Sequence, residues 1–324
     1  MKSVLAVALN PAVDFSGEAD AVQHTRKVRT GNDRFDPGGG GVNVARVITM
    51  FGGDAEALLL AGGEMGALLE RLLKERSVRY RALPIAGQTR VSFTVRDRMT
   101  GREYRFVPKG PSVRRDEIQS FFDMAASRKV DYLVASGSLP EGCPPDIYGH
   151  MADLAAARGT RFVLDSSGEG LRTTLERSRV FLVKPSIGEL EQFAGRKLGE
   201  DDVHRVARDL VADGAAELVA VTMGAGGALL ASADGVLRLP AIHVNQQSAV
   251  GAGDSFLGGM VWALSEGRSV VDAFRFGIAA GAAAVMTLGT ELCRREDTMT
   301  LFDGIYGVGD NETEAAVASK LPDD

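Results

Sequence analysis

The sequence is poor in cysteine, in tryptophan and in long apolar runs. Its 324 residues include two cysteines, Cys143 and Cys293, and one tryptophan. Two cysteines so far apart make no disulfide framework, and this scarcity is typical of a reducing cytosol. The apolar N-terminal run is interrupted at Asn10-Pro11 and Asp14, and no apolar stretch reaches the length of a membrane span. We therefore expect a cytoplasmic protein with neither a signal peptide nor a membrane partner.

An excess of positive charge is also missing. The chain has 37 Lys and Arg residues against 43 Asp and Glu residues, a formal net charge of −6. Because nucleic acids attract basic faces, this balance argues against a nucleic-acid partner. The apolar fraction of 45% is ordinary for a globular protein, and the length suffices for a large core. The composition leaves small molecules as the expected ligands.

Two common nucleotide-binding fingerprints are absent from the sequence. No GxxxxGK[ST] occurs in it, and no GxGxxG opens a helix after the first predicted strand. The first string marks P-loop proteins, and the second marks dinucleotide-binding domains. Their absence disfavours P-loop enzymes and dinucleotide-dependent oxidoreductases.

What the chain does contain is an alternation of apolar runs and helical patterns. Continuous apolar runs of strand length are typical of strands buried on both faces, as in parallel sheets. Their alternation with helices predicts an α/β fold with a mainly parallel sheet. The predicted strands are 3–9, 56–62, 131–137, 161–167, 180–186 and 217–224. The predicted helices are 41–51, 64–76, 114–128, 144–158, 187–194, 201–213, 254–266 and 270–288.

Two stretches depart from this pattern. Residues 12–35 are polar and mixed, whereas residues 88–107 alternate around a Met-Thr-Gly turn. Such alternation is typical of a half-exposed hairpin, so the two stretches predict a small antiparallel layer, a lid, outside the main sheet. We expect one composite domain over residues 1–308, and the polar, acidic residues 309–324 predict a disordered tail.

The heptapeptide VGAGDSF, residues 250–256, contains the first candidate catalytic group, Asp254. Its small residues let the main chain approach a ligand, and the unpartnered amides at the start of a helix attract anions. A carboxylate beside an anion site is suited to take a proton from a nucleophile that attacks the anion. The motif therefore favours phosphoryl transfer, and a glycine turn with Asp254 as a helix cap is the alternative.

The glycine-rich string FDPGGGGVNVARVI opens another predicted helix. Glycines at such a place let the backbone approach a ligand, and Asn43 in the first turn can bind ligand hydroxyls. A flexible loop with a helix cap is the alternative. Asp14, just beyond the first strand, is an acceptor suited to sugar hydroxyls, or else a solvated loop acid.

Two later motifs are candidates for nucleotide and metal binding. In KPSIGEL, Lys184 follows a buried strand, and Glu189 lies on the next helix, where it can hold a hydrated Mg²⁺. A surface pair around a helix start is the alternative reading. In VTMGAGGALL, residues Thr222, Gly224 and Gly227 can receive phosphates or a ribose, although a tight β-hairpin explains the string equally well.

The predicted lid is rich in cations. Lys27, Arg29, Arg90 and Arg105 all fall within it. Arginine is suited to bidentate phosphate recognition, whereas exposed strands also carry arginine for solubility. These cations favour a phosphorylated substrate.

Taken in order, eight strings between residues 3 and 305 resemble the PfkB (ribokinase-like) carbohydrate kinase family. The resemblance implies a three-layer α/β/α sandwich with a β-sheet lid, ATP and Mg²⁺ as cofactors, and a site for K⁺. Other branches of the family read GGKG where this chain reads GGGG, which implies fructose 6-phosphate as the acceptor. A kinase of tagatose 6-phosphate or fructose 1-phosphate and a non-catalytic sugar-phosphate-binding homologue remain alternatives. The strings are NPAVD, PGGGGVNVAR, SGSLPEG, DSSGEGL, LVKPSIGEL, VTMGAGGAL, VGAGDSF and FGIAAGAAA.

The resemblance also implies a role for each matching residue. Asp254 corresponds to the base, and the amides of Gly251, Ala252 and Gly253 correspond to an anion hole. The substrate side comprises Asp14, Lys27, Gly38, Gly39, Asn43, Arg90, Arg105 and Ser138. The nucleotide side comprises Lys184, Ser186, Thr222, Gly224 and Gly227, with a water-mediated Mg²⁺ contact by Glu189. The K⁺ loop comprises Ser248, Val250, Ala284, Thr287, Gly289 and Glu291.

The chain departs from the family pattern at one position, Ser186. The NxxE motif of the family has Ser186 in place of asparagine, which predicts weaker or shifted Mg²⁺ binding. The resemblance also implies a homodimer in which two lids pair. Val91, Phe93 and Val95 on one side of a lid strand would otherwise leave an apolar face and open edges exposed.

Overall fold

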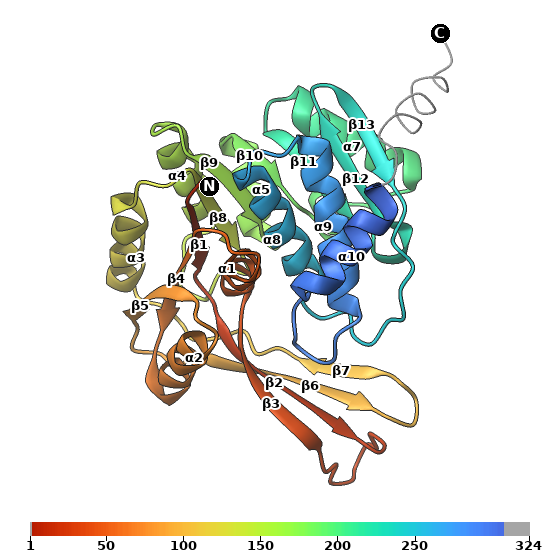
Figure 1. The fold of residues 1–324 in the computed structure, drawn as a ribbon. Helices are drawn as coiled ribbons and strands as arrows, with labels where there is room; N and C mark the ends of the chain where they lie inside the picture. Colours follow the sequence, from red (N-terminus) through yellow and green to blue (C-terminus); the bar gives the residue numbers. More distant parts are fainter. Residues whose placement is uncertain (1, 308–324) are drawn as a thin grey trace.

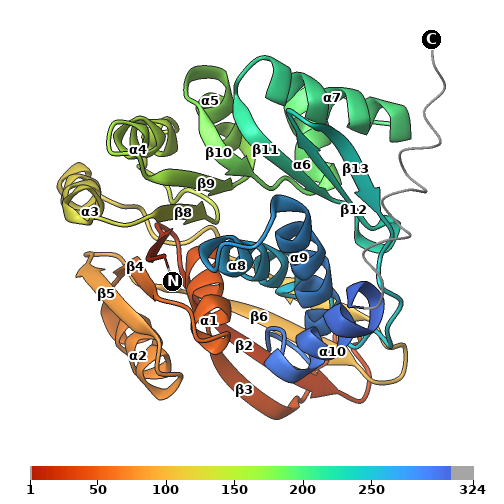
Figure 2. The ribbon, with the colours of Figure 1, turned by 45° about the horizontal axis from the view of Figure 1, so that its top comes forward.

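The structure is a computed structural model that describes residues 2–307, and the predicted acidic tail lies outside these residues. A nine-stranded sheet forms its centre, in the order β13-β12-β11-β10-β9-β8-β1-β4-β5. The seven strands from β5 to β11 pair in parallel, and β12 and β13 continue the sheet in antiparallel fashion. Helices cover both faces of this sheet, as Figures 1 and 2 show, so the predicted three-layer α/β/α sandwich is confirmed. The strands are β1 (Val4–Ala8), β4 (Ala55–Ala61), β5 (Arg79–Pro84), β8 (Tyr132–Ser136), β9 (Arg161–Asp165), β10 (Val180–Val183), β11 (Ala216–Thr222), β12 (Ala228–Ser232) and β13 (Gly235–Leu239).

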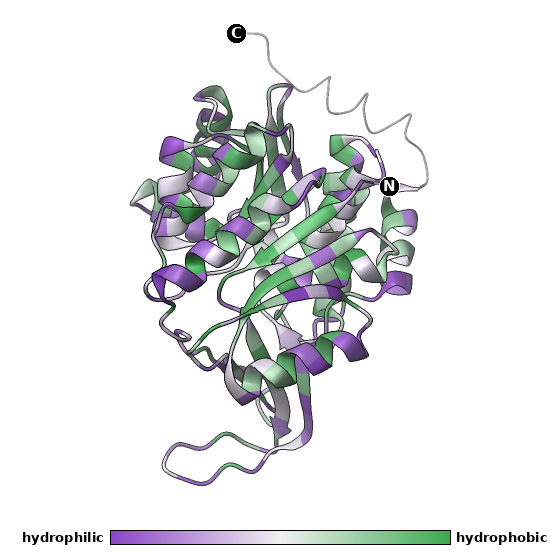
Figure 3. Cartoon of the chain, turned by 90° about the vertical axis from the view of Figure 1, so that its left-hand side faces the viewer, coloured by the Kyte–Doolittle hydropathy of each residue, from purple (hydrophilic) through white to green (hydrophobic). Residues whose placement is uncertain are grey.

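The alternating side chains of the sheet divide the interior into two cores. Val4 and Ala6 of β1 face one core, whereas Leu5 and Val7 face the other. Both sets are buried because β1 lies in the middle of the sheet, which explains its unbroken apolar sequence. The same apolar character runs along the neighbouring strands in Figure 3. The first core is covered by α1 (Gly40–Met50), α2 (Gly63–Glu75), α8 (Ala252–Ser265), α9 (Val270–Val285) and α10 (Arg295–Tyr306). The second core is covered by α3 (Arg115–Ser127), α4 (Ile147–Ala156), α5 (Gly168–Arg177), α6 (Ile187–Ala194) and α7 (Glu200–Ala212).

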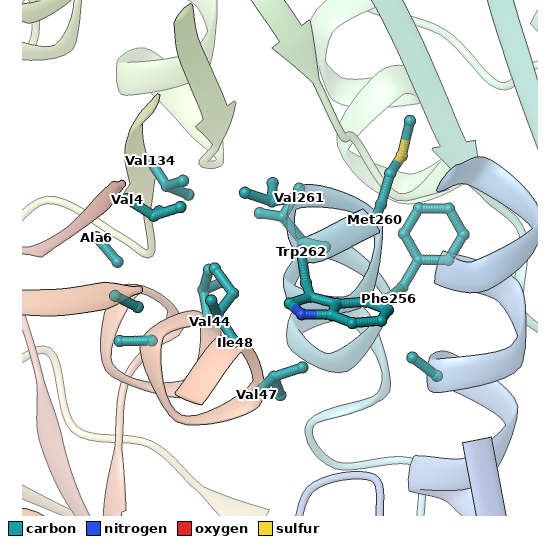
Figure 4. Packing of buried hydrophobic residues seen from close by; sticks show 14 of the residues in the cluster. Val4, Ala6, Val44, Val47, Ile48, Val134, Phe256, Met260, Val261 and Trp262 are labelled. Atoms are coloured by element: carbon teal, nitrogen blue, oxygen red, sulfur yellow. The ribbon is translucent and has the colours of Figure 1, made fainter. Parts of the chain in front are cut away.

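The single tryptophan anchors the first core. The ring of Trp262 on α8 lies 5.0 Å from that of Phe51 and 4.7 Å from that of Phe276. Figure 4 shows Trp262 beside Val47 and Ile48, which come from α1. The helix that carries Asp254 is thereby packed against the helix that carries Asn43, and this packing fixes the spacing of the two groups.

The predicted lid is a separate four-stranded sheet, in the order β3-β2-β6-β7, below the main body in Figure 1. The predicted hairpin is confirmed as the antiparallel pair of β6 and β7. The prediction of a wholly antiparallel layer is wrong, because β2 pairs with β6 in parallel. Strands so far apart in sequence are free to run in either direction, since no tight turn joins them. The lid strands are β2 (Ala12–Ala19), β3 (Gly31–Gly38), β6 (Arg90–Asp97) and β7 (Glu103–Phe106).

The alternation along β6 has a direction that the sequence did not reveal. Ser92 and Thr94 are 4% and 2% exposed, whereas Phe93 between them is 44% exposed. The polar side chains Ser92 and Thr94 therefore turn inward and Phe93 turns outward, while Val91 at the start of the strand is partly buried against the first core. This inversion is typical of a strand whose inner face borders a ligand pocket rather than a core.

The remaining predicted helices and strands agree with the structure. The predicted helices and buried strands are all present, with ends that differ by a few residues, and VTMGAGGALL forms the antiparallel turn between β11 and β12 through η1 (Gly224–Gly226). β5, β13, α5 and α10 were not predicted, since most of their residues are exposed or half-buried. No helix within residues 2–307 is long and apolar enough to cross a bilayer.

Candidate active site

A cavity of about 720 Å³ lies between the carboxyl edge of the main sheet, the N-terminus of α8 and the lid. Cavities of this size hold drug-sized ligands. Parallel strands bring their carboxyl ends to one edge, where open α/β sheets bind ligands. The predicted residues that line the cavity are Asp14, Gly39, Asn43, Arg90, Arg105, Ser138, Lys184, Ser186, Glu189, Thr222, Gly224, Gly227, Val250, Gly251, Ala252, Gly253 and Asp254.

Asp254 lies in the first turn of α8, and its carboxylate faces the cavity. The helix begins after Gly251, whose φ of +76° is a left-handed conformation that favours glycine. Asn43 Nδ2 donates a 2.7 Å hydrogen bond to Asp254 Oδ2. Burial, reinforced by the charge of Asp165, raises the pKa of Asp254 to about 6, and Asn43, Lys184 and Arg105 oppose this shift. The carboxylate can accept a proton and is ionised near neutral pH.

A buried ion pair lies next to Asp254, and only one of its two members, Lys184, was predicted as a site residue. Lys184 Nζ lies 3.0 Å from Asp165 Oδ1, and the two side chains are 5% and 12% exposed. Ser136 Oγ donates to Asp165 Oδ2 over 3.1 Å. Burial lowers the pKa of Lys184, but Asp165 and Glu189 outweigh burial and leave it raised, so the ammonium stays charged. Asp165 was missed as a site residue, although an acid at the end of an apolar run is a signal that could have found it.

Asp14 and two arginines form the lid side of the cavity. Burial raises the pKa of Asp14, while Arg105, Ser92, Arg46 and Arg90 act in the opposite direction. Arg90 is held by its donation to the carbonyl oxygens of Asn10, at 2.7 Å, and Pro108, at 2.9 Å. Any side chain at Gly38 would collide with the Asp14 carboxylate, which explains one glycine of the four.

Two predicted substrate residues differ in their placement. Ser138 lines the cavity, and its hydroxyl accepts a 3.3 Å hydrogen bond from Asn10 Nδ2. Lys27 is exposed on the connection between β2 and β3 and does not line the cavity. Of the four predicted lid cations, Arg90 and Arg105 line the cavity of this chain. Lys27 and Arg29 do not.

Ser186, which replaces the asparagine of the family motif, caps α6. Its side chain accepts from the Glu189 amide at 3.3 Å, and its own amide donates to Glu189 Oε2 at 2.7 Å. This reciprocal capping box fixes the Glu189 carboxylate at the rim of the cavity. Within residues 2–307 no three His, Cys, Asp or Glu side chains group as metal ligands. Mg²⁺ keeps most of its waters and needs one or two carboxylates, and the carboxylate residues Glu189 and Asp165 both line the cavity.

The residues predicted for a K⁺ loop come together from two segments. Ser248 Oγ lies 3.0 Å from the carbonyl oxygen of Gly289, and Thr287 Oγ1 lies 2.8 Å from those of Ala284 and Glu291. The Val250 amide donates to Ser248 Oγ at 3.1 Å. Glu103 Oε2 also lies 3.0 Å from Ser248 Oγ, and Glu103 Oε1 is buried without a hydrogen-bond partner among the described residues. Carbonyl, hydroxyl and carboxylate oxygens of the kind gathered around Ser248 are the ligands that a hard cation prefers.

This fold and this cavity define the class of ribokinase-like sugar kinases. The family model for pfkB family carbohydrate kinases matches residues 1–297, and the chain belongs to that family. It is 41% identical over 303 residues, 93% of this chain and 89% of the relative, to ATP-dependent 6-phosphofructokinase isozyme 2 of Mycobacterium tuberculosis. The Escherichia coli protein of the same name is 35% identical over 304 residues, 93% of this chain and 98% of the relative.

The structural comparison agrees. The crystal structure of phosphofructokinase-2 from Escherichia coli in complex with potassium matches with a TM-score of 0.90 and 35% identity, over 94% of this chain and 99% of that chain. Another structure of the Escherichia coli protein is a complex with substrates and products. The present chain is thus an ATP-dependent, 6-phosphofructokinase-like sugar kinase.

Proposed function

We propose that the protein transfers the γ-phosphoryl group of ATP to fructose 6-phosphate, which gives fructose 1,6-bisphosphate and ADP. The observation that carries the proposal is the buried Asp254 carboxylate beside the amides at the N-terminus of α8, in a cavity that Arg90 and Arg105 also line. Relatives with this activity in their names cover nearly the whole chain.

The reaction follows from the positions of these groups. The sugar hydroxyl oxygen attacks the γ-phosphorus, and its proton passes to Asp254 as the new P–O bond forms. The bond between the γ-phosphorus and the bridging oxygen of the β-phosphate breaks, and that oxygen leaves on ADP. The amides of Gly251, Ala252 and Gly253, which have no partner within α8, stabilise the charge on the transferring group. Such a loose transition state needs positioning and charge stabilisation more than covalent help.

The two cofactor ions have distinct roles in this proposal. Glu189 and Asp165 would hold Mg²⁺ through water, and the ion would neutralise charge on the phosphate oxygens. Ser248, Val250, Ala284, Thr287, Gly289 and Glu291 would hold K⁺, next to the start of α8. A cation at that place would steady the loop whose amides face the phosphoryl group.

The direct test is ADP release with MgATP and K⁺ against fructose 6-phosphate, tagatose 6-phosphate, fructose 1-phosphate and fructose. A clear preference for fructose 6-phosphate supports the proposal. Turnover mainly of another sugar would keep the mechanism and change the substrate. No turnover of any of the four would favour a non-catalytic sugar-phosphate-binding role.

Arg105 gives a test of how the substrate phosphate is bound. Its side chain lines the cavity from β7, and charge-assisted hydrogen bonds to phosphate are about twice as strong as neutral ones. We expect Arg105→Gln to raise the KM for fructose 6-phosphate roughly 10- to 100-fold, with a smaller effect on kcat. Steady-state kinetics with fructose, which has no phosphate, supplies the control. An equal loss with both sugars would contradict the assignment.

We further propose that two lids pair in a homodimer. Phe35, Phe93 and Phe106 are 45%, 44% and 63% exposed on the lid sheet, an apolar face that a monomer would leave in water. Light scattering at micromolar concentration is expected to show a dimer for the unmodified protein and a monomer for Phe93→Glu. Ile305→Glu is the matched control, because Ile305 is 50% exposed on α10, outside the lid. Dissociation by both variants, or by neither, would count against the lid interface.

A further inference from the structure

Asn43 holds the Asp254 carboxylate, and Arg46 fixes which way the Asn43 amide points. Asn43 Nδ2 donates to Asp254 Oδ2 at 2.7 Å, and Asn43 Oδ1 accepts from Arg46 Nη1 at 2.9 Å. A carboxylate only accepts and a guanidinium only donates, so both neighbours require the same orientation of the amide. With the amide reversed, two oxygens would face each other at Asp254 and two donors at Arg46.

Arg46 is itself held in place from within the protein. Its Nη1 also donates to the carbonyl oxygen of Pro37 at 2.6 Å, and its Nη2 lies 3.9 Å from Asp36 Oδ1. Burial lowers the pKa of Arg46 to about 10, with Asp36 opposing the shift, so the guanidinium remains charged at neutral pH. Arg46 is 9% exposed and does not line the cavity.

Asp36 is the anion that keeps this cation buried. It is 1% exposed and lies at the end of β3. Arg34 Nε lies 2.6 Å from Asp36 Oδ2, Arg76 Nη2 lies 2.7 Å from Oδ1, and Thr290 Oγ1 donates to Oδ2 at 2.9 Å. Asp36 therefore keeps charged partners when any one arginine is removed, and substitution of Arg46 leaves no bare buried charge.

We propose that Arg46, held by Asp36 and the Pro37 carbonyl, is a positioning residue that orients Asn43 and thereby the carboxylate of Asp254. This inference rests on the proposed function for its catalytic consequence, because it assumes that Asp254 is the base. Without Arg46, only Asp254 orients the Asn43 amide, and the amide no longer donates to Asp254 in every molecule. The proton acceptor then loses both its orientation and a hydrogen bond that favours its charged form.

Four charged or polar groups near Asp254 raise or lower its pKa. Asp165, at the end of β9, favours the protonated form of the carboxyl. Lys184, Arg105 and Asn43 favour the ionised form. Arg46→Met leaves these four groups in place but removes its own positive charge, so comparison with Arg46→Lys, which keeps the charge, isolates the part of the effect that passes through Asn43.

The decisive experiment is the ¹³C NMR titration of the Asp254 carboxyl, identified by difference against Asp254→Asn. In Arg46→Met we expect the midpoint to rise by about one pH unit, as the loss of one charge-assisted hydrogen bond implies. The kcat for fructose 6-phosphate is expected to fall about 10- to 100-fold, and the acid limb of its pH profile to move upward with the titration. Arg46→Met added to Asn43→Ala is expected to cause no further shift.

Arg76→Met is the matched control, since Arg76 also pairs with Asp36 but lies on the C-terminal side of α2 and touches neither Asn43 nor the cavity. It is expected to lower stability while leaving the titration and kcat unchanged. Arg46→Lys, which keeps the charge, is expected to shift the midpoint in the same direction by a smaller amount. If Arg46→Met does not fold, the titration midpoint of the Asp254 carboxyl in Arg46→Lys tests the proposal instead. A midpoint that coincides with that of the unmodified protein would overturn the proposal. Because the titration requires no turnover, it decides the question even if Asp254→Asn proves active and the proposed function fails.

Discussion

Replacement of Asp254 by asparagine is expected to lower kcat by at least about 10²- to 10⁴-fold, the usual contribution of a general base. Asparagine keeps the size of the side chain and an oxygen acceptor for Asn43, so the fold and the cavity remain. What is lost is the ability to take the proton of the sugar hydroxyl. Steady-state kinetics with saturating MgATP and fructose 6-phosphate measures the effect. Near-normal turnover would end the assignment of Asp254 as the base.

The pH dependence of the same group gives an independent check. Because the pKa of Asp254 lies at about 6, kcat/KM is expected to fall as the pH drops below 6, where the carboxyl becomes protonated. The consequence for stability has the opposite direction. A raised pKa stabilises the folded state below the unfolded value of 3.8, and this contribution is lost as the pH rises through 6. Asp254→Asn should therefore raise Tm at pH 8 and leave it almost unchanged below pH 4.

Replacement of Lys184 by methionine is expected to damage both catalysis and folding. A Cβ on Gly253 would lie 3.6 Å from Lys184 Nζ, which places the ammonium beside the proposed anion hole. Loss of one such stabilising group typically costs kcat about 10²- to 10³-fold. The variant also leaves Asp165, 12% exposed, without its ion-pair partner, which costs about 3 kcal/mol of the free energy of unfolding. Enzyme kinetics and urea denaturation measure the two effects.

Two controls separate the catalytic effect from the structural one. In Lys184→Met combined with Asp165→Asn, the unpaired charge is removed, so stability is expected to return. The kcat of this double variant is compared with that of Asp165→Asn alone, because Asp165 also lies at the proposed Mg²⁺ site, and it is expected to be lower. Lys197→Met breaks an exposed pair with Glu191, in which Lys197 is 91% exposed, and is expected to change stability by less than about 1 kcal/mol. Recovery of kcat in the double variant would show that Lys184 acts on the fold alone.

The sequence predicted most of the fold because its main signals are local. A strand buried on both faces, such as β1, has to be apolar throughout. The sheet shows this apolar pattern where helices cover both of its faces. The glycine-rich strings predicted backbone that lines the cavity, since Gly39 and Gly251 both line it and both have a positive φ. The weaker elements β5, β13, α5 and α10 carried no comparable signal.

Several site features could not be predicted from the sequence. Asp165 becomes part of the site because β9 and β10 are neighbours in parallel register, which is a property of the sheet. Arg46 lies within the predicted helix 41–51 but was not predicted as a site residue, because its contact with Asn43 needs the turn of α1 and the buried anion Asp36 together. Lys27, placed at the substrate by resemblance, does not line the cavity of this chain.

The sequence by itself determined the α/β class, the small lid and the chemical types at the site, because these depend on periodicity and on residues that adjoin one another in the chain. Only the tertiary structure decided the parallel pairing of β2 with β6, the outward apolar face of the lid and the ion pair of Lys184 with Asp165. Those features join segments far apart in sequence, and which of them meet is settled by the packing of the whole chain.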